Sequence, residues 1–279
     1  MTSRVVVVGA GLSGSVIARQ LAEASIPVTI LDERRHLGGN CYTERDPQTG
    51  VMIHKYGPHI FHTDDDEVWD FVNKYTRFMP YKNQVKANFM GRIYSLPINL
   101  HTINQLFGSS MSPDEARSFI DQMAVKTINE PKNFEEQALK FVGHEIYNAF
   151  LKGYTIKQWG VHPTALPSSI LKRLPVRFDY NDNYFSHKLQ GIPEFGYAPL
   201  FENMLDHKNI EVSLNTRVNA SDLNSFAHVF WSGTLDGWFM NDLGDLQYRT
   251  LDFEQFMHHG TCQGCAVMNY SDEDIPWTR

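Results

Sequence analysis

The sequence lacks a long apolar run and an excess of positive charge. No apolar stretch approaches the roughly 18 residues of a membrane helix, and the chain starts with a strand pattern in place of a basic and apolar signal, so we expect a cytoplasmic protein. Lysine and arginine number 25 against 32 aspartate and glutamate, which gives a formal net charge of −7. This balance disfavours nucleic acid or an anionic membrane as a partner.

Cysteine is also scarce. Three cysteines, an odd number, disfavour a disulfide framework, and Cys262-Gln263-Gly264-Cys265 has no second pair to complete a zinc site. We therefore predict core or strand cysteines and no metal. No Ser/His/Asp nucleophile set, acid–base carboxylate pair or Walker loop stands out, so we expect any reactive centre to be a bound cofactor.

The first 32 residues follow the order strand, glycine-rich turn, helix, strand, acid. The run Val5–Val8 predicts a buried parallel strand, and Gly9-Ala10-Gly11-Leu12-Ser13-Gly14 follows it directly. An amphipathic stretch and a second apolar run, Val28–Leu31, then lead to Asp32. In this context the glycine motif indicates a dinucleotide-binding β-α-β unit, the alternative being a purely structural tight turn.

Each conspicuous residue of this unit has a physical role. Gly9 permits the tight turn, Gly11 lets the backbone approach a pyrophosphate, and Gly14 lets the helix pack closely on the strand. The helix N-terminus offers unpaired N–H groups to the phosphates. The carboxylate of Asp32 can bind a pair of ribose hydroxyls.

A second glycine pair favours FAD over NAD as the dinucleotide. Gly38 and Gly39 follow the ribose acid, where flavoproteins of the glutathione-reductase type place glycines beside the FAD pyrophosphate; the alternative is a simple loop turn. Residues 227–233 read as a strand that ends on a glycine, and residues 210–218 alternate like a strand that passes near the adenine. Both elements are typical of the same flavoprotein class.

The rest of the chain predicts a helical insert and an antiparallel sheet. Residues from Leu100 to about Lys172 read as helical, with a capping box at residues 112–115 and a helix that starts after Asn133 and ends at Gly143. Residues 81–97 and 241–270 read as antiparallel strands. The predicted fold is α/β, in three parts: an FAD-binding Rossmann-like domain (1–80 and 192–240), a helical domain (98–172) and an antiparallel sheet domain (81–97, 173–191 and 241–279).

Three further segments could carry chemistry. His59 and His62 stand three residues apart without an evident third metal ligand, and they fit either a packed loop or a flavin-facing one. Residues 172–177 contain three cations, which could bind a diphosphate or form a solvated face, and the aromatic pair Tyr184-Phe185 could stack on a base or sugar. Trp159 fits core packing and ligand binding equally well.

Together these motifs resemble the bacterial UDP-galactopyranose mutase family. Stretches peculiar to that family run in order along the chain: Val8–Gly11, His36–Asn40, Tyr56–His62, Ser95–Asn99, Gly153–Gly160, Lys172–Phe178, Asn183–Phe185 and Val267–Tyr270. The resemblance implies a cytoplasmic, homo-oligomeric isomerase that supplies galactofuranose for surface polysaccharides. It would interconvert UDP-galactopyranose and UDP-galactofuranose without net redox change, through a covalent adduct between the sugar and N5 of reduced FAD.

The resemblance also implies roles for matching residues. Arg173, on a loop that closes over the diphosphate, and His62, near the flavin ring, would support catalysis. Contacts to FAD are implied for Ser13, Asp32, Glu33, Asn40, His59, Ile60 and Val218, beside the motif glycines Gly9, Gly11, Gly14 and Gly39. The UDP-sugar site would comprise Asn83, Thr155, Trp159, Arg173, Tyr184, Asn269 and Arg279, with Phe185 beside Tyr184.

Members of this family continue beyond the position of Arg279. The further residues include an arginine near the flavin, two tyrosines that contact the substrate diphosphate, and a helix that caps the flavin. Their absence from this sequence predicts an open flavin pocket, an exposed strand edge and impaired activity. The alternatives are an inactive remnant that binds UDP-sugars or nucleotides, and an amine-oxidase-like flavoenzyme, which the segments around Trp159 and Arg173 disfavour.

Overall fold

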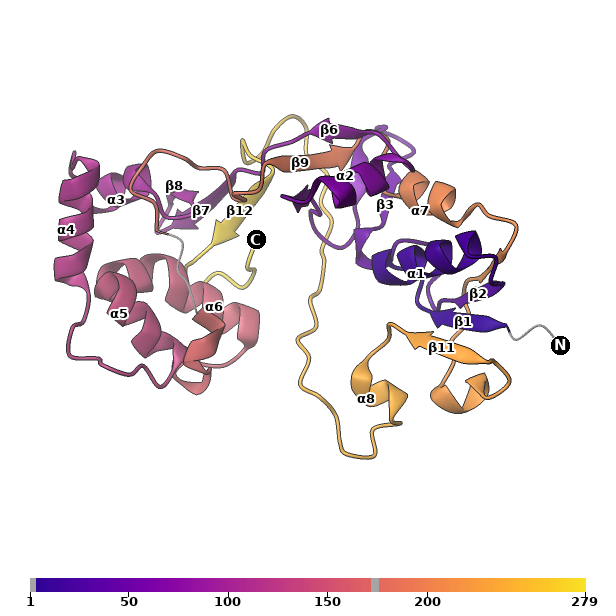
Figure 1. Ribbon diagram of the computed structural model, residues 1–279. Helices are drawn as coiled ribbons and strands as arrows, with labels where there is room; N and C mark the ends of the chain where they lie inside the picture. The colour runs from indigo at the N-terminus through magenta and orange to yellow at the C-terminus, as the bar shows by residue number, and fades with distance from the viewer. Residues whose placement is uncertain (1–3, 172–175) are drawn as a thin grey trace. The chain divides into compact units, whose positions relative to one another are not determined.

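The computed structural model describes residues 4–171 and 176–279 (Figure 1). By their internal contacts the residues divide into two compact units. Unit 1 comprises Met1–Tyr81 and His187–Gln255, and unit 2 comprises Lys82–Ser186 and Phe256–Arg279. No helix in the described ranges is both long and apolar enough to cross a membrane.

Unit 1 is built on a parallel sheet with the strand order β10-β2-β1-β11. The strands are β1 (Val5–Val8), β2 (Val28–Leu31), β10 (Ile210–Ser213) and β11 (His228–Trp231), and Val5 of the central strand pairs with Val28 on one side and His228 on the other. Helix α1 (Leu12–Glu23) follows β1, and Ala18 packs with fully buried Val7 and Ile30. Since all four strands are parallel, their carboxyl ends share one edge.

The remainder of unit 1 forms a second layer around α7 (Ala198–Leu205), whose Leu200, Phe201 and Met204 are fully buried. Helix α2 (Asp66–Asn73) packs into the same cluster, as does the antiparallel sheet β5 (Phe61–Thr63), β9 (Leu189–Pro193) and β6 (Phe78–Pro80). The smaller elements are η1 (Gly39–Cys41), the hairpin β3 (Thr43–Arg45) and β4 (Met52–His54), η5 (Ala220–Leu223) and α8 (Leu235–Trp238).

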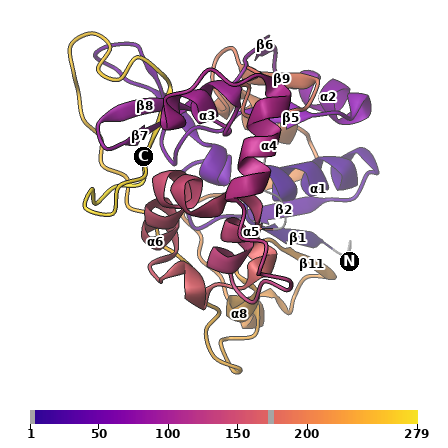
Figure 2. The same ribbon diagram turned by 90° about the vertical axis from the view of Figure 1, so that its left-hand side faces the viewer.

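Unit 2 combines a three-stranded sheet with helices that share its core. The sheet order is β12-β7-β8, from β7 (Val85–Phe89), β8 (Arg92–Leu96) and β12 (Val267–Tyr270). Figure 2 shows α4 (Pro113–Met123) beside α3 (Leu100–Phe107) and α5 (Phe134–Ile146). The chain continues through η2 (Tyr147–Lys152), α6 (Gly153–Trp159), η3 (Pro163–Ala165) and η4 (Ser168–Leu171).

One hydrophobic cluster joins the strands and helices of unit 2: Ala87 and Tyr94 from the sheet pack with Ile103, Val142 and Phe150. The contacts therefore divide the chain differently from the three predicted domains. The helical and sheet domains merge, and residues 187–191 and 241–255 belong to unit 1. Apolar periodicity identifies which face of an element is buried, but it does not identify the element that covers that face.

The helix boundaries follow the predicted caps. The capping box of Ser112 with Glu115 and the cap by Asn133 are confirmed. The predicted helix end at Gly143 is confirmed in the backbone, because Gly143 has φ 73° and ψ −176° and separates the helix that starts after Asn133 from a short helical stretch that continues to Ile146 within α5. A Cβ atom on Gly143 would lie 2.4 Å from the Met123 carbonyl oxygen, so this position requires glycine both for its backbone conformation and for a close approach.

The predicted antiparallel strands of 241–270 are wrong, except that Val267–Tyr270 does form a strand, β12. Residues 239–266, all of which the structure describes, contain no strand, and β12 pairs in parallel with β7. The alternating side chains of this segment are not buried on either face: Leu243 is 99% exposed and Phe256 is 70% exposed. An alternating pattern of apolar and polar residues does not stabilise a strand when neither face of the segment is buried.

Candidate functional site

Unit 1 contains a cavity of about 420 Å³ at the carboxyl edge of its parallel sheet. Loops that follow β1, β2, β10 and β11 surround it, as expected for a ligand site in an open α/β sheet. The lining residues are Val8, Gly9, Gly11, Leu31, Asp32, Glu33, Arg34, Gly39, Asn40, Thr216, Arg217, Val218, Asn219, Trp231, Ser232, Gly233, Thr234 and Gly237. Seven residues predicted to bind the cofactor thus meet in one place: Gly9, Gly11, Asp32, Glu33, Gly39, Asn40 and Val218.

The two glycine motifs meet at the wall of this cavity. A Cβ atom on Gly39 would lie 3.3 Å from the Gly11 Cα atom, and one on Gly11 would lie 3.9 Å from the Gly39 Cα atom. Gly11 is the N-cap of α1, with no side-chain cap and no acidic residue in the first turn. The positive end of the helix is therefore free to interact with an anion at a place where two backbones come close.

The other motif glycines have packing roles. A Cβ atom on Gly14 would lie 1.9 Å from the Gly9 carbonyl oxygen, so this position holds α1 against the turn. Gly9 adopts φ 104°, and a Cβ atom there would meet the Ser232 Oγ at 2.1 Å. Gly38 adopts φ 88° and packs on the ring of Phe201.

Asp32 lines the cavity and stabilises the glycine-rich turn through hydrogen bonds. It is 8% exposed, and its carboxylate accepts hydrogen bonds from the backbone N–H of Ala10 at 2.6 Å and of Arg34 at 2.7 Å. A carboxylate can accept about four hydrogen bonds, so lone pairs remain for a ribose hydroxyl. The role of Asp32 in binding ribose stays a prediction.

Arg34 is a lining residue that the sequence reasoning missed. Its guanidinium lies over the Tyr56 ring, 4.8 Å from the centroid, and donates to the Asn40 Oδ1 at 3.0 Å. It thereby orients a side chain predicted to contact the cofactor. Other lining residues that were missed share one signal, because they lie at or after the carboxyl ends of β10 and β11. They are Thr216, Arg217, Asn219, Trp231, Ser232, Thr234 and Gly237.

Four predicted cofactor residues lie outside the lining: Ser13, Gly14, His59 and Ile60. Ser13 is exposed in the first turn of α1. His59 is fixed locally, because its Nδ1 lies 2.9 Å from the Gly57 carbonyl oxygen and its own carbonyl accepts from the Tyr197 hydroxyl at 3.1 Å.

His62, on β5, forms a pair with His187. Their Nδ1 atoms lie 2.8 Å apart and the rings stack with centroids 4.6 Å apart. One of the two nitrogens must donate and the other accept, so both rings cannot be protonated there. Burial and the neighbouring His187 lower the pKa of His62 below its usual value. In the described part of the chain, no three His, Cys, Asp or Glu side chains gather as a metal site would require.

Unit 2 carries the predicted substrate residues. Asn83 and Asn269 are the most informative, because the Oδ1 of each is buried without a hydrogen-bond partner among the described residues. Asn269 is paired with Ala87 of β7, and Asn83 lies two residues before that strand begins. An unpaired buried acceptor costs about 1–3 kcal/mol, so the two unpaired acceptors suggest that a ligand donates to them.

The remaining predicted substrate residues have mixed surroundings. Thr155 is buried at 5% exposure, whereas Trp159 and Tyr184 are 39% and 44% exposed. The rings of Tyr184 and Phe185 meet edge to face, 5.2 Å apart. Arg279 donates to the Tyr154 hydroxyl at 2.7 Å. Arg173 lies outside the described residues.

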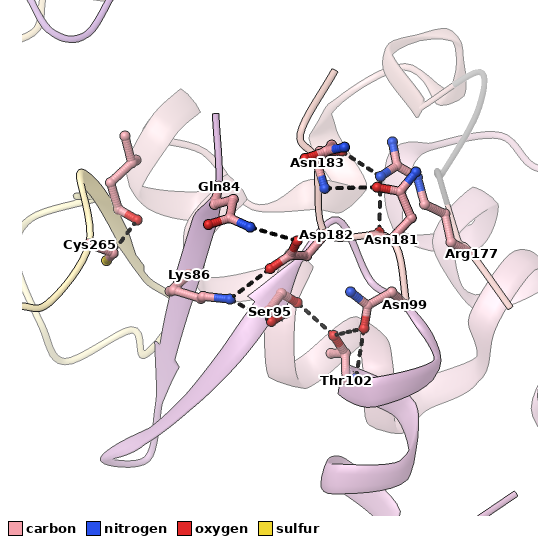
Figure 3. A network of polar contacts seen from close by, with 11 residues as sticks. Gln84, Lys86, Ser95, Asn99, Thr102, Arg177, Asn181, Asp182, Asn183 and Cys265 are labelled. Atoms are coloured by element: carbon pink, nitrogen blue, oxygen red, sulfur yellow. Dashed lines mark hydrogen bonds and ion pairs between the residues drawn. The ribbon is translucent and has the colours of Figure 1, made fainter. Parts of the chain in front are cut away.

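A polar network holds the loop that carries Tyr184 (Figure 3). Asp182 accepts hydrogen bonds from the Gln84 side chain at 2.9 Å and from the Lys86 ammonium at 3.1 Å. Burial would raise the pKa of Asp182, but these two partners lower it overall. Arg177, one of the three predicted cations, donates to the carbonyl oxygens of Asn181 and Asn183. Its guanidinium thus stabilises the loop conformation.

Comparisons with known proteins support the family resemblance. A family model described as UDP-galactopyranose mutase matches residues 149–279, and an NAD(P)-binding Rossmann-like domain matches residues 7–75. A protein of Klebsiella pneumoniae named "Probable UDP-galactopyranose mutase" is 58% identical over 275 residues, which cover 99% of this chain and 72% of the relative. The dTDP-fucopyranose mutase of Escherichia coli is 55% identical over 284 residues, covering 99% and 75%.

A solved structure shares the fold. The crystal structure of reduced UDP-galactopyranose mutase matches with a TM-score of 0.64 at 17% identity, over 86% of this chain and 57% of that chain. This chain therefore spans little more than half of the solved protein. The predicted α/β fold with a Rossmann-like domain is confirmed, and so is the predicted resemblance.

Proposed function

Since the chain belongs to the UDP-galactopyranose mutase family, we propose that it interconverts UDP-galactopyranose and UDP-galactofuranose with the help of bound, reduced FAD. The observation that carries the proposal is the cavity that Gly11 and Gly39 line together at the N-terminus of α1. A pyrophosphate needs two backbones without Cβ atoms and a helix N-terminus without competing carboxylates, and this cavity offers both.

The residues of unit 1 would hold the cofactor by complementary charge. The first turn of α1 would bind the pyrophosphate, Asp32 would accept from the adenosine ribose, and Arg34 would keep Asn40 in place. When bound, the reduced flavin would supply a nucleophilic N5 atom toward the anomeric carbon of the sugar. His62, kept neutral by burial, would hold one proton shared with His187.

The residues of unit 2 would bind the nucleotide sugar. The unpaired Oδ1 atoms of Asn83 and Asn269 would accept from ligand hydroxyl or N–H groups. Tyr184 would offer a ring face to the base or sugar, and Arg279 and Arg173 would neutralise the charge of the departing diphosphate. Positioning and charge complementarity are thus the contributions of the protein.

A second candidate substrate is a dTDP-linked fucopyranose. The Escherichia coli relative that is named for it is nearly as similar to this chain as the Klebsiella pneumoniae relative. Both substrates are nucleoside diphosphate hexoses and would use the same diphosphate contacts. They differ in the base, at the 2′ position of the pentose and at C6 of the hexose.

The test starts with the visible spectrum of the purified chain, in which flavin absorbance is expected. The protein is then incubated with dithionite and UDP-galactofuranose, and UDP-galactopyranose is measured by chromatography. Parallel samples contain dTDP-fucofuranose, or omit dithionite, and the second of these should show no turnover. A colourless protein that takes up no added FAD would refute the cofactor. Flavin binding without turnover of either sugar would leave only the nucleotide-binding alternative.

A further inference from the structure

Lys157, on α6, is held by the main chain of a distant segment. Its ammonium donates to the carbonyl oxygens of Tyr270 at 2.8 Å, Asp272 at 2.7 Å and Trp277 at 3.1 Å. An ammonium has three N–H donors, so these three contacts use all of them. Lys157 is therefore fully occupied and is not available as a direct ligand of the substrate diphosphate.

The contacted segment follows β12 and lies closely against α6. A Cβ atom on Gly153 would lie 2.1 Å from the Ser271 carbonyl oxygen, so the helix and the segment touch through their backbones. Lys152 forms an ion pair with Glu273 at 2.9 Å, and Tyr154 accepts from Arg279. Within unit 2, the helix that carries Thr155 and Trp159 thus supports the segment that carries Asn269 and Arg279.

The segment has other restraints besides Lys157. No helix or strand follows Tyr270 in residues 271–279, all of which the structure describes. Tyr270 N–H donates to the Thr278 carbonyl and Ser271 N–H to the Asn88 carbonyl, both at about 3 Å, and the two oxygens of the Asp272 carboxylate accept from the Met90 N–H at 3.1 and 3.0 Å. The Lys157 ammonium adds three charge-assisted bonds that tie carbonyl oxygens of the segment directly to α6.

We propose that Lys157 is a positioning residue for the nucleotide-sugar site. By binding three carbonyl oxygens it holds Asn269 and Arg279 in register with Thr155 and Trp159 on α6. This inference rests on the proposed function, and it extends that function to a residue that need not touch the ligand.

The experiment compares Lys157→Met, which keeps the length of the side chain without donors, with Lys157→Arg, which keeps the charge and several donors. Lys140→Met is the matched control, because Lys140 also donates to a carbonyl oxygen in unit 2, that of Asn129, at 2.7 Å. UDP affinity is measured by calorimetry, flavin content by absorbance, and amide hydrogen exchange of residues 269–279 by mass spectrometry.

For Lys157→Met we expect UDP affinity to fall about tenfold or more, since charge-assisted hydrogen bonds are lost, and exchange in residues 269–279 to rise. Flavin content should not change. Lys157→Arg should stay within about threefold of the wild type in UDP affinity, because it keeps the charged contacts. Lys140→Met should stay within the same range, because it leaves the segment untouched. If the methionine variant does not fold, Lys157→Gln, which retains an N–H donor, takes its place and should lie between the arginine variant and a tenfold loss.

Two outcomes overturn the inference separately from the function. If the wild-type chain binds UDP and Lys157→Met binds it equally well, Lys157 has only a structural role and the proposed function stands, whatever the exchange rates are. If the wild-type chain binds no UDP, the proposed function fails and the inference fails with it.

Discussion

Replacement of Gly11 by alanine separates a cofactor role of this glycine from a structural one. At Gly11 the backbone has φ −77°, which any residue adopts, and the added Cβ atom would lie 3.9 Å from the nearest heavy atom, an ordinary van der Waals distance. The fold should therefore tolerate the methyl group. A pyrophosphate bound against the wall that Gly11 and Gly39 form should not, because the methyl group would occupy space at that wall.

The expected magnitudes differ clearly between the two effects. Alanine is a poorer N-cap than glycine but lowers the entropy of the unfolded chain, so the free energy of unfolding without cofactor should change by less than about 1 kcal/mol. Loss of one charge-assisted hydrogen bond to the pyrophosphate should cost about 1.5–3 kcal/mol, a weakening of FAD binding by roughly 10- to 150-fold. Flavin retention during purification and a fluorescence titration with FAD measure this loss.

Gly14→Ala is the informative contrast. Its Cβ atom would lie 1.9 Å from the Gly9 carbonyl oxygen, so this variant should lose stability even without cofactor. An FAD affinity of Gly11→Ala equal to that of the wild type would refute the placement of the pyrophosphate against the two glycines. Unfolding of Gly11→Ala in the absence of FAD would refute the steric argument itself.

Three further changes test other parts of the structure. Asn269→Leu removes a buried acceptor that lacks a partner, so the free energy of unfolding should stay the same or rise by about 1 kcal/mol while UDP affinity falls, as chemical denaturation and calorimetry can show. Burial and His187 lower the pKa of His62 in the folded chain, so as the pH falls below about 6.5 the unfolded chain is protonated at His62 before the folded chain is. The stability that neutral His62 contributes is therefore complete above that pH and is lost as the pH falls through the lowered pKa. His62→Asn should flatten the curve of unfolding free energy between about pH 7 and 5. Gly143→Ala should cost at least about 2 kcal/mol, because it combines a left-handed backbone with a Cβ atom 2.4 Å from the Met123 carbonyl oxygen. Gly108→Ala, at φ 62° with open space around it, should lower the free energy of unfolding by only about 1 kcal/mol, and thermal melts of both variants measure the two losses.

The opening β-α-β unit could be predicted in detail because its constraints are local. Gly14 lies within a few residues of the atom that excludes a Cβ at its position, the Gly9 carbonyl oxygen. The same holds for the capping box of Ser112, which depends only on Glu115. Local hydrogen bonds and sterics leave a readable pattern in the sequence.

The features that escaped prediction depend on distant partners. The sequence around Val267 reads as a strand, but the parallel pairing with Val85 is set by the fold of unit 2. Arg34 became a candidate only when Asn40 and Tyr56 were found beside its guanidinium. The unpaired acceptors of Asn83 and Asn269 likewise appear only once their surroundings are known. For the substrate side chains, the family resemblance guided the prediction, since no periodicity distinguishes them.

The pairing of β1 has a consequence for synthesis of the chain on the ribosome. One side of β1 can bond to β2 early, but the other side must wait for His228–Trp231, after residues 82–186 of unit 2 have been made. Until then the N–H and C=O groups on that side of Val5–Val8 have no native partner, beside a strongly apolar face. Nascent chains of this length should therefore depend on chaperones to keep the first strand from pairing with other molecules.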